Sequence, residues 1–119
     1  MTRVLLVEDH ALFREALASL LAHHPQMEVD QAGTLGEARQ KLRGIDVVVL
    51  DIVLPDGDGI DLISELRACN SGASVLVLSA SPDSANPDRA LKAGADAVLE
   101  KVEAPFRIFD EIERIGGVN

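Results

Sequence analysis

The sequence of 119 residues is poor in cysteine and in aromatic side chains. Its one cysteine, Cys69, has no partner for a disulfide within the chain, and no Cys/His cluster has the spacing of a zinc site. With three Phe and neither Trp nor Tyr, the chain offers little surface for stacking a base or a flavin. No apolar run approaches the ~20 residues that cross a bilayer, and the N-terminus lacks a signal-peptide pattern. We therefore expect a soluble, cytoplasmic protein.

Basic residues are also scarce, because 11 Lys and Arg stand against 20 Asp and Glu for a formal net charge of −9. A nucleic acid surface needs clustered Lys and Arg to neutralise phosphates, so this charge argues against direct nucleic acid binding. Hydrophobic residues make up 47% of the chain, which is typical of a folded protein and not of a disordered acidic tail. The sequence predicts one folded domain that favours a cation or a basic partner.

Short apolar runs alternate with amphipathic segments along the chain. The runs cover residues 4–7, 27–31, 47–50, 75–78 and 97–99. Four of them are continuous and rich in β-branched residues or Leu, which is typical of strands buried on both faces of a parallel sheet, whereas residues 27–31 are weakly patterned. The helical patterns are an apolar stripe of Phe13, Ala16, Leu17, Leu20 and Leu21, then residues 34–42, a stretch with Leu62, Ile63 and Leu66, residues 87–93, and a helix starting at Pro105. Five such units predict an α/β fold: a doubly wound, flavodoxin-like parallel sheet of order 2-1-3-4-5.

Polar side chains follow the expected strands at the edge where ligands bind in such sheets. Glu8 and Asp9 follow the first strand, Asp51 the third, Ser79 the fourth, and Lys101 comes shortly after the fifth. Because strands 1 and 3 are neighbours in this order, the three carboxylates lie beside one another. Clustered carboxylates repel, and a divalent cation such as Mg²⁺, which prefers oxygen ligands, relieves that repulsion.

Asp51 is central in this arrangement, between the acidic pair and the side chains of Ser79 and Lys101. A carboxylate can act as a nucleophile toward phosphorus when a metal ion and a lysine neutralise the charge that develops on the phosphoryl oxygens. Asp51 is therefore the candidate nucleophile toward phosphorus.

These residues belong to segments that resemble the receiver domain of two-component response regulators, over essentially the whole chain. The matching segments are residues 4–10, 47–55, 57–59, 78–80 and 93–95, followed by Lys101. The segment from Glu8 to Arg14 is most similar to the NarL/FixJ-type subgroup, whose full-length members attach a helix-turn-helix DNA-binding domain. Several matches in the right order at the right spacing make the resemblance specific.

The resemblance implies that Asp51 accepts a phosphoryl group from a sensor histidine kinase and loses it slowly by self-hydrolysis. Lys101 matches the lysine that contacts the phosphoryl oxygens, and Ser79 matches the Ser/Thr whose hydroxyl moves to the phosphoryl group. Such a protein is not an enzyme with turnover, because its own side chain is the substrate.

The resemblance also implies that Mg²⁺ is the cofactor. The family holds the ion with the residues that match Asp9, Asp51 and the backbone carbonyl of Val53, and Glu8 completes the acidic pair.

Two positions depart from the family pattern. The family usually has Tyr or Phe where this chain has Val98, and many members have a proline where this chain has Val102. Because a valine cannot swing a ring inward on activation, we expect a smaller or differently routed conformational shift.

The output of the domain stays open at this point. Residues 1–119 are expected to form a single receiver domain without an output domain, so transcription would be controlled by a DNA-binding domain outside this chain. The alternative is a stand-alone receiver that docks a partner or acts as a phosphate sink. The resemblance further suggests a homodimer through the face of the fourth helix, fifth strand and fifth helix.

Other functions fit the residues less well. An aspartyl phosphatase commonly has an acid two residues after the nucleophile, where this chain has Val53. A flavodoxin-like cofactor carrier would place a phosphate beside Glu8 and Asp9, which would repel it. An EF-hand loop starting at Asp56 fails because its twelfth position is Arg67 and not Glu.

Overall fold

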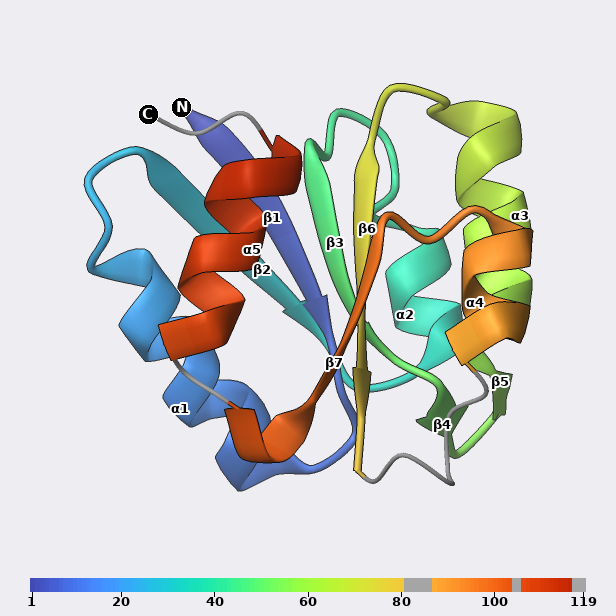
Figure 1. Ribbon diagram of the computed structural model, residues 1–119, viewed down its shortest axis with the longest axis horizontal. Coiled ribbons are helices and arrows are strands. Elements are labelled where there is room, and N and C mark those ends of the chain that lie inside the picture. The colour runs from blue at the N-terminus through green and yellow to red at the C-terminus, as the bar shows by residue number, and fades with distance from the viewer. Residues whose placement is uncertain (81–86, 104–105, 117–119) are drawn as a thin grey trace.

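The central sheet has five parallel strands in the order β2-β1-β3-β6-β7 (Figure 1). The computed structural model describes residues 1–80, 87–103 and 106–116. The strands of the sheet are β1 (Thr2–Val7), β2 (Met27–Ala32), β3 (Val47–Asp51), β6 (Ser74–Ser79) and β7 (Ala97–Glu100). Because β6 and β7 are the fourth and fifth strands of this sheet, the predicted 2-1-3-4-5 order is confirmed. A separate antiparallel hairpin of β4 (Val53–Leu54) and β5 (Gly57–Asp58) was not predicted.

Helices cover both faces of the sheet (Figure 1). Figure 1 shows α1 (Ala11–Ala22) and α5 (Phe106–Gly116) on one face, and α2 (Leu35–Arg39), α3 (Gly59–Cys69) and α4 (Pro87–Ala93) on the other. A short 3₁₀ helix, η1 (Lys101–Glu103), follows β7. The bounds of α4 agree with the prediction, and the predicted start of the last helix at Pro105 lies outside the described residues.

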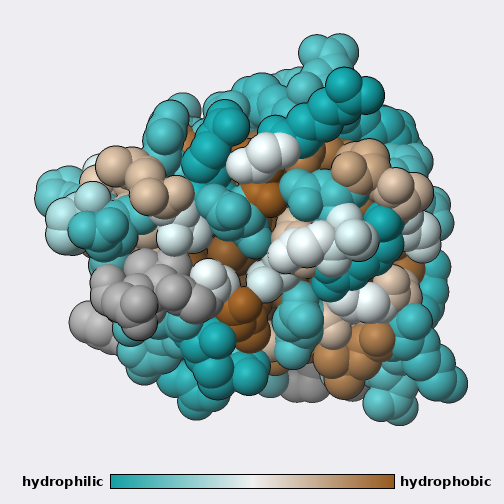
Figure 2. All heavy atoms as spheres, turned by 90° about the horizontal axis from the view of Figure 1, so that it is seen from above, coloured by the Kyte–Doolittle hydropathy of each residue, from teal (hydrophilic) through white to brown (hydrophobic). Residues whose placement is uncertain are grey.

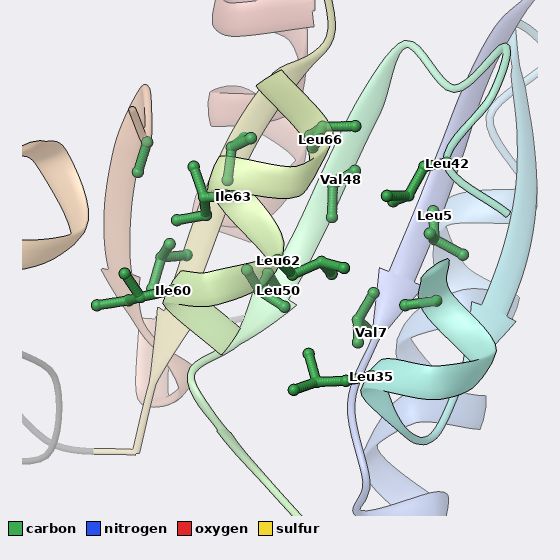
Figure 3. Close-up of a cluster of buried hydrophobic side chains, with 14 of the residues drawn as sticks. Leu5, Val7, Leu35, Leu42, Val48, Leu50, Ile60, Leu62, Ile63 and Leu66 are labelled. Atoms are coloured by element: carbon green, nitrogen blue, oxygen red, sulfur yellow. The ribbon is translucent and has the colours of Figure 1, made fainter. Parts of the chain in front are cut away.

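Alternate residues of β3 enter two separate cores. Val48 and Leu50 pack into the cluster shared with α2 and α3, and Val47 and Val49 pack into the cluster shared with α1 and α5. Figure 3 shows the first cluster, in which Leu35 from α2 and Leu66 from α3 lie near the sheet. Burial on both faces explains why this strand is apolar at every position before its last one.

The buried face of α1 is narrower than the apolar stripe predicted. Leu17 and Leu21 are buried with Ala18, whereas Ala16 is exposed and Leu20 is 44% exposed. The helix turns a narrow face to the sheet, so the outer part of a wide apolar stripe remains in solvent.

The helix α2 ends three residues earlier than the predicted end at Leu42. After Arg39 the backbone amides of Gln40 and Lys41 bond to carbonyls three residues back, which is a tighter turn than an α-helix. The side-chain amide of Asn70 in turn donates to the carbonyl oxygens of Leu42 (3.1 Å) and Ile45 (2.8 Å). A tertiary contact therefore satisfies carbonyls that have no helical partner after the end of α2.

The end of the molecule at the amino ends of the strands is largely hydrophilic (Figure 2). Hydrophobic residues show there only between polar ones, so this face has no broad apolar surface among the residues drawn in colour. In the described part of the chain, no helix combines the length and apolar character needed to cross a membrane.

Candidate functional site

Parallel register brings the ends of β1, β3 and β6 to one level. Val7 pairs with Leu50 across β1 and β3, and Asp51 pairs with Leu78 across β3 and β6. Glu8, the residue after β1, therefore lies beside the end of β3. Asp51 is itself the last residue of β3, whereas the sequence predicted that it would follow the end of the strand.

The next two site residues come from β6 and η1. Ser79 is the last residue of β6, is 4% exposed, and pairs in register with Glu100 of β7. Lys101 follows as the first residue of η1. The sheet thus delivers both residues to the same edge as the acidic side chains.

The start of α3 lies directly against the end of β3. The Gly59 amide donates to the Ile52 carbonyl oxygen at 2.7 Å, and a Cβ on Gly59 would lie 2.5 Å from the carbonyl oxygen of Asp51. Asp58 caps the helix by accepting from the amide of Ile60 at 2.9 Å. Only a residue without a side chain permits this approach, which holds the backbone of Asp51 in place.

Three carboxylates meet at this edge. One oxygen from each of Glu8, Asp9 and Asp51 lies within 4.8 Å of the others. Glu8 is 1% exposed and Asp51 is 8% exposed, whereas Asp9 is open to solvent. Asp51 Oδ1 accepts a hydrogen bond from the amide of Val53 at 3.1 Å. The predicted clustering of the three acids is therefore present.

The ammonium group of Lys101 supplies positive charge to the cluster. Its Nζ lies 3.0 Å from Asp51 Oδ2 and also contacts Glu8 Oε1. The same Nζ lies 5.2 Å from the ring centroid of Phe13, within the range of a cation–π contact. Burial lowers the pKa of Lys101, but the hydrogen bonds to Glu8 and Asp51 outweigh it and raise that pKa above its usual value. Lys101 is therefore charged at neutral pH.

The pKa of Glu8 lies well above that of an ordinary surface acid. Burial and the hydrogen bond with Asp51 raise the pKa of Glu8 to about 7, although the contact with Lys101 partly counteracts them. Its Oε2 also accepts from the amide of His10 at 3.3 Å. Near neutral pH the cluster is thus close to the point at which Glu8 gains or loses a proton.

A cavity of about 250 Å³ opens beside the acidic cluster. It is lined by Asp9, Asp51, Ile52, Val53, Leu78, Ser79 and Ala80. The cavity places Ser79 on the same small space as the carboxylate of Asp51, and Val53, another of its lining residues, is 64% exposed. Its volume suits a small, polar group held between these residues.

The donor set fits a hard divalent cation. Mg²⁺ is bound in proteins by one or two carboxylates together with other oxygen atoms. The cluster offers three carboxylates against the single ammonium of Lys101 among the contacts described. The amide of Val53 faces Asp51, and the predicted role of the Val53 carbonyl as a metal ligand stays a prediction.

Sequence reasoning missed the part that α1 plays at this site. His10, an exposed residue of the loop before α1, is the N-cap of this helix and accepts from the amide of Phe13 at 3.3 Å. Arg14 donates to the carbonyl oxygen of Glu8 at 2.8 Å. A basic residue so near the start of a helix opposes the helix dipole, and this was the signal that the sequence offered.

Comparison with known proteins gives one family. The family profile described as "Response regulator receiver domain" matches residues 4–113. The chain is 43% identical over 110 residues to the KDP operon transcriptional regulatory protein KdpE of Escherichia coli K12, covering 91% of this chain and 47% of that protein. It is 30% identical over 115 residues to the chemotaxis protein CheY of Thermotoga maritima, covering 95% and 96% of the two chains.

A solved structure agrees in fold. The response regulator TrrA of Thermotoga maritima, in complex with Mg²⁺-BeF, superposes with a TM-score of 0.85 at 27% identity, covering 97% of this chain and 99% of that chain. The chain spans only part of the length of three curated relatives that it matches: 47% of KdpE, and 30% and 59% of two others. The five-stranded parallel sheet, the acidic cluster at its carboxyl edge and the match over residues 4–113 lead to one conclusion. The chain belongs to the family of response regulator receiver domains, the phosphorylation-dependent switches of two-component signalling.

Proposed function

We propose that Asp51 accepts a phosphoryl group from a sensor histidine kinase in a Mg²⁺-dependent reaction. The observation that carries this proposal is the position of Asp51. It is a buried acid on the 250 Å³ cavity, and it accepts hydrogen bonds from the amide of Val53 and from Lys101. Its carboxylate is thus oriented on one side by the backbone and on the other by a cation.

The chemistry is a displacement at phosphorus. A carboxylate oxygen of Asp51 forms the new O–P bond, and the bond between phosphorus and the donor's leaving group breaks, with its electron pair going to the leaving group. Lys101, already 3.0 Å from Asp51 Oδ2, neutralises charge on the phosphoryl oxygens. Glu8, Asp9, Asp51 and the carbonyl of Val53 would hold a Mg²⁺ ion, which would supply further neutralisation. The hydroxyl of Ser79 lines the same cavity and is the proposed donor to the phosphoryl group afterwards.

Intact-mass measurement with acetyl phosphate and Mg²⁺ tests this assignment. We expect the mass of one phosphoryl group on the wild-type chain, none with EDTA, and none on Asp51→Asn. Asp61→Asn, a change at an exposed acid in the first turn of α3, is the matched control and keeps the adduct. An adduct that survives on Asp51→Asn would refute the assignment.

The phosphoryl group stays on Asp51 until water removes it, so the chain is proposed to have no enzymatic turnover. The position two residues after Asp51 is Val53, which provides no acid to protonate a leaving alcohol. Incubation with p-nitrophenyl phosphate distinguishes the two cases. Steady release of nitrophenol over many equivalents would favour a phosphatase.

The proposed output is a change in the face formed by α4, β7 and α5. The contact that supports it is the ion pair between Arg89 of α4 and Asp58, whose charged atoms lie 2.6 Å apart. Asp58 caps α3, and Gly59 at the start of α3 lies against Asp51. A homodimer through this face is part of the proposal. Light scattering with and without Mg²⁺ and beryllofluoride tests it, and an unchanged monomer mass at high protein concentration would contradict it.

The whole protein is proposed to be a transcriptional regulator whose DNA-binding domain lies outside the single receiver domain of residues 1–119. The partial coverage of KdpE supports this reading, and the nearly complete coverage of CheY favours the alternative of a stand-alone receiver. The reading frame beyond Asn119 separates the two. A cytoplasmic location stays a prediction.

A further inference from the structure

The segment that carries Glu8 and Asp9 has irregular backbone between β1 and α1. On its β1 side the amide of Glu8 donates to the carbonyl oxygen of Ala32 in β2 at 3.0 Å. The peptide plane between Glu8 and Asp9 is the next unit along the chain. Because a peptide unit is planar, the position of the Glu8 carbonyl oxygen sets the direction in which Asp9 departs.

That carbonyl oxygen is held by Arg14. Its Nη1 donates to Glu8 O at 2.8 Å, and its Nε donates to the side-chain oxygen of Gln31 in β2 at 3.2 Å. The amide of Arg14 donates to the carbonyl of His10 at 2.9 Å, so the same residue closes the first turn of α1. A guanidinium is a rigid, planar fork, and two anchored donors therefore fix the position of the oxygen that it binds.

Gly33 lies close to this fork. A Cβ on Gly33 would lie 3.0 Å from Arg14 Nη1, which is closer than ordinary van der Waals contact. Arg14 is half-buried, and both of these side-chain hydrogen bonds go to neutral oxygens. Its guanidinium is thus packed between β2 and the acidic segment as a positioning group.

We propose that Arg14 is a positioning residue for the metal site: by holding the Glu8 carbonyl oxygen, it fixes the geometry in which the carboxylates of Glu8 and Asp9 meet that of Asp51. This inference rests on the proposed function, because it assumes that these three acids bind Mg²⁺. Removing a group that orients metal ligands typically weakens metal affinity by about 10- to 100-fold.

A Mg²⁺ titration followed by amide chemical shifts tests the inference without any phosphorylation. We expect Arg14→Met to raise the Kd for Mg²⁺ by about tenfold or more, although all carboxylates remain. Arg14→Lys keeps the positive charge but not the planar fork that reaches both Glu8 and Gln31, so it should weaken Mg²⁺ binding as well. Arg43→Met, at an exposed arginine before β3, is the matched control and should bind like the wild type.

Thermal unfolding in EDTA separates positioning from a merely structural role. A structural arginine would lower the melting temperature and leave the Kd for Mg²⁺ unchanged, and that result in Arg14→Met overturns the inference. If Arg14→Met does not fold, Arg14→Lys decides, because a wild-type Kd in this variant overturns the inference equally. A wild-type chain that binds no Mg²⁺ would instead reject the proposed function together with this inference.

Discussion

Glu8 shows how burial changes the chemistry of a single side chain. It is 1% exposed beside two other carboxylates, and its pKa rises to about 7 because burial and Asp51 disfavour its charged form. An unfolded chain has Glu8 ionised above its ordinary pKa, so the folded chain binds the extra proton between that value and about 7. The stability from this proton is fully present at low pH and is lost as the pH rises through about 7.

We therefore expect the stability of the wild-type chain relative to Glu8→Gln to fall as the pH rises from about 4.5 to about 8 in EDTA, by about 1 to 3 kcal/mol. Chemical denaturation of both variants over this range measures the difference. Glu15→Gln, at an exposed acid of α1, is the control and should show no such trend. Because a cation needs Glu8 ionised, the affinity for Mg²⁺ should rise over the same range, and a flat affinity would speak against the raised pKa.

At the scale of elements, the join between β3 and α3 determines where Asp51 points. A side chain at Gly59 would meet the carbonyl oxygen of Asp51 at 2.5 Å, so either the helix or the strand end must shift. We expect Gly59→Ala to cost about 1 to 3 kcal/mol of unfolding free energy, the range for overpacked sites. It should also weaken Mg²⁺ binding, because the carboxylate moves with its backbone.

Gly72→Ala is the control for that prediction, because a Cβ at Gly72 meets nothing within 4 Å. Urea denaturation and a Mg²⁺ titration of the two variants measure both effects. Equal stability and equal affinity in Gly59→Ala and Gly72→Ala would show that α3 does not position Asp51 by this contact.

At the scale of the whole molecule, the proposed output requires a change at Asp51 to reach the face of α4, β7 and α5. Val98, half-buried in β7, stands where the family usually has an aromatic residue, so no ring can move there. The ion pair of Arg89 with Asp58 offers another connection, because Asp58 caps the helix that contacts Asp51.

We expect beryllofluoride with Mg²⁺ to shift amide resonances of α4 as well as those around Asp51. In Arg89→Met the shifts in α4 should shrink while those at the site remain, because the connection to Asp58 is lost. Lys92→Met, at an exposed lysine of the same helix, is the control. Shifts confined to the surroundings of Asp51 in the wild-type chain would indicate a weak switch or a phosphate sink.

The local hydrophobic pattern of the sequence predicted the buried strands of the sheet. The strands from Val47 and from Val75 are apolar at successive positions because both faces of the sheet are covered. A continuous apolar run in the sequence is enough to indicate such a strand. The end of α2 was predicted wrongly at Leu42: after Arg39 the chain tightens into turns that bond three residues back, and the carbonyls of Leu42 and Ile45 are satisfied by Asn70 from a distant part of the chain. Such a contact between side chain and backbone leaves no periodic signal.

The sequence by itself determined the parallel α/β architecture and the clustering of Glu8, Asp9 and Asp51, because strand order and strand ends suffice to bring these residues to one edge. Only the tertiary structure decided which groups orient them. Two contacts depend on how helices lie against strand ends in three dimensions. They are the hydrogen bond from Arg14 to the Glu8 carbonyl oxygen and the close approach of Gly59 to Asp51. The raised pKa of Glu8 depends on burial, which arises only when the surrounding elements pack together.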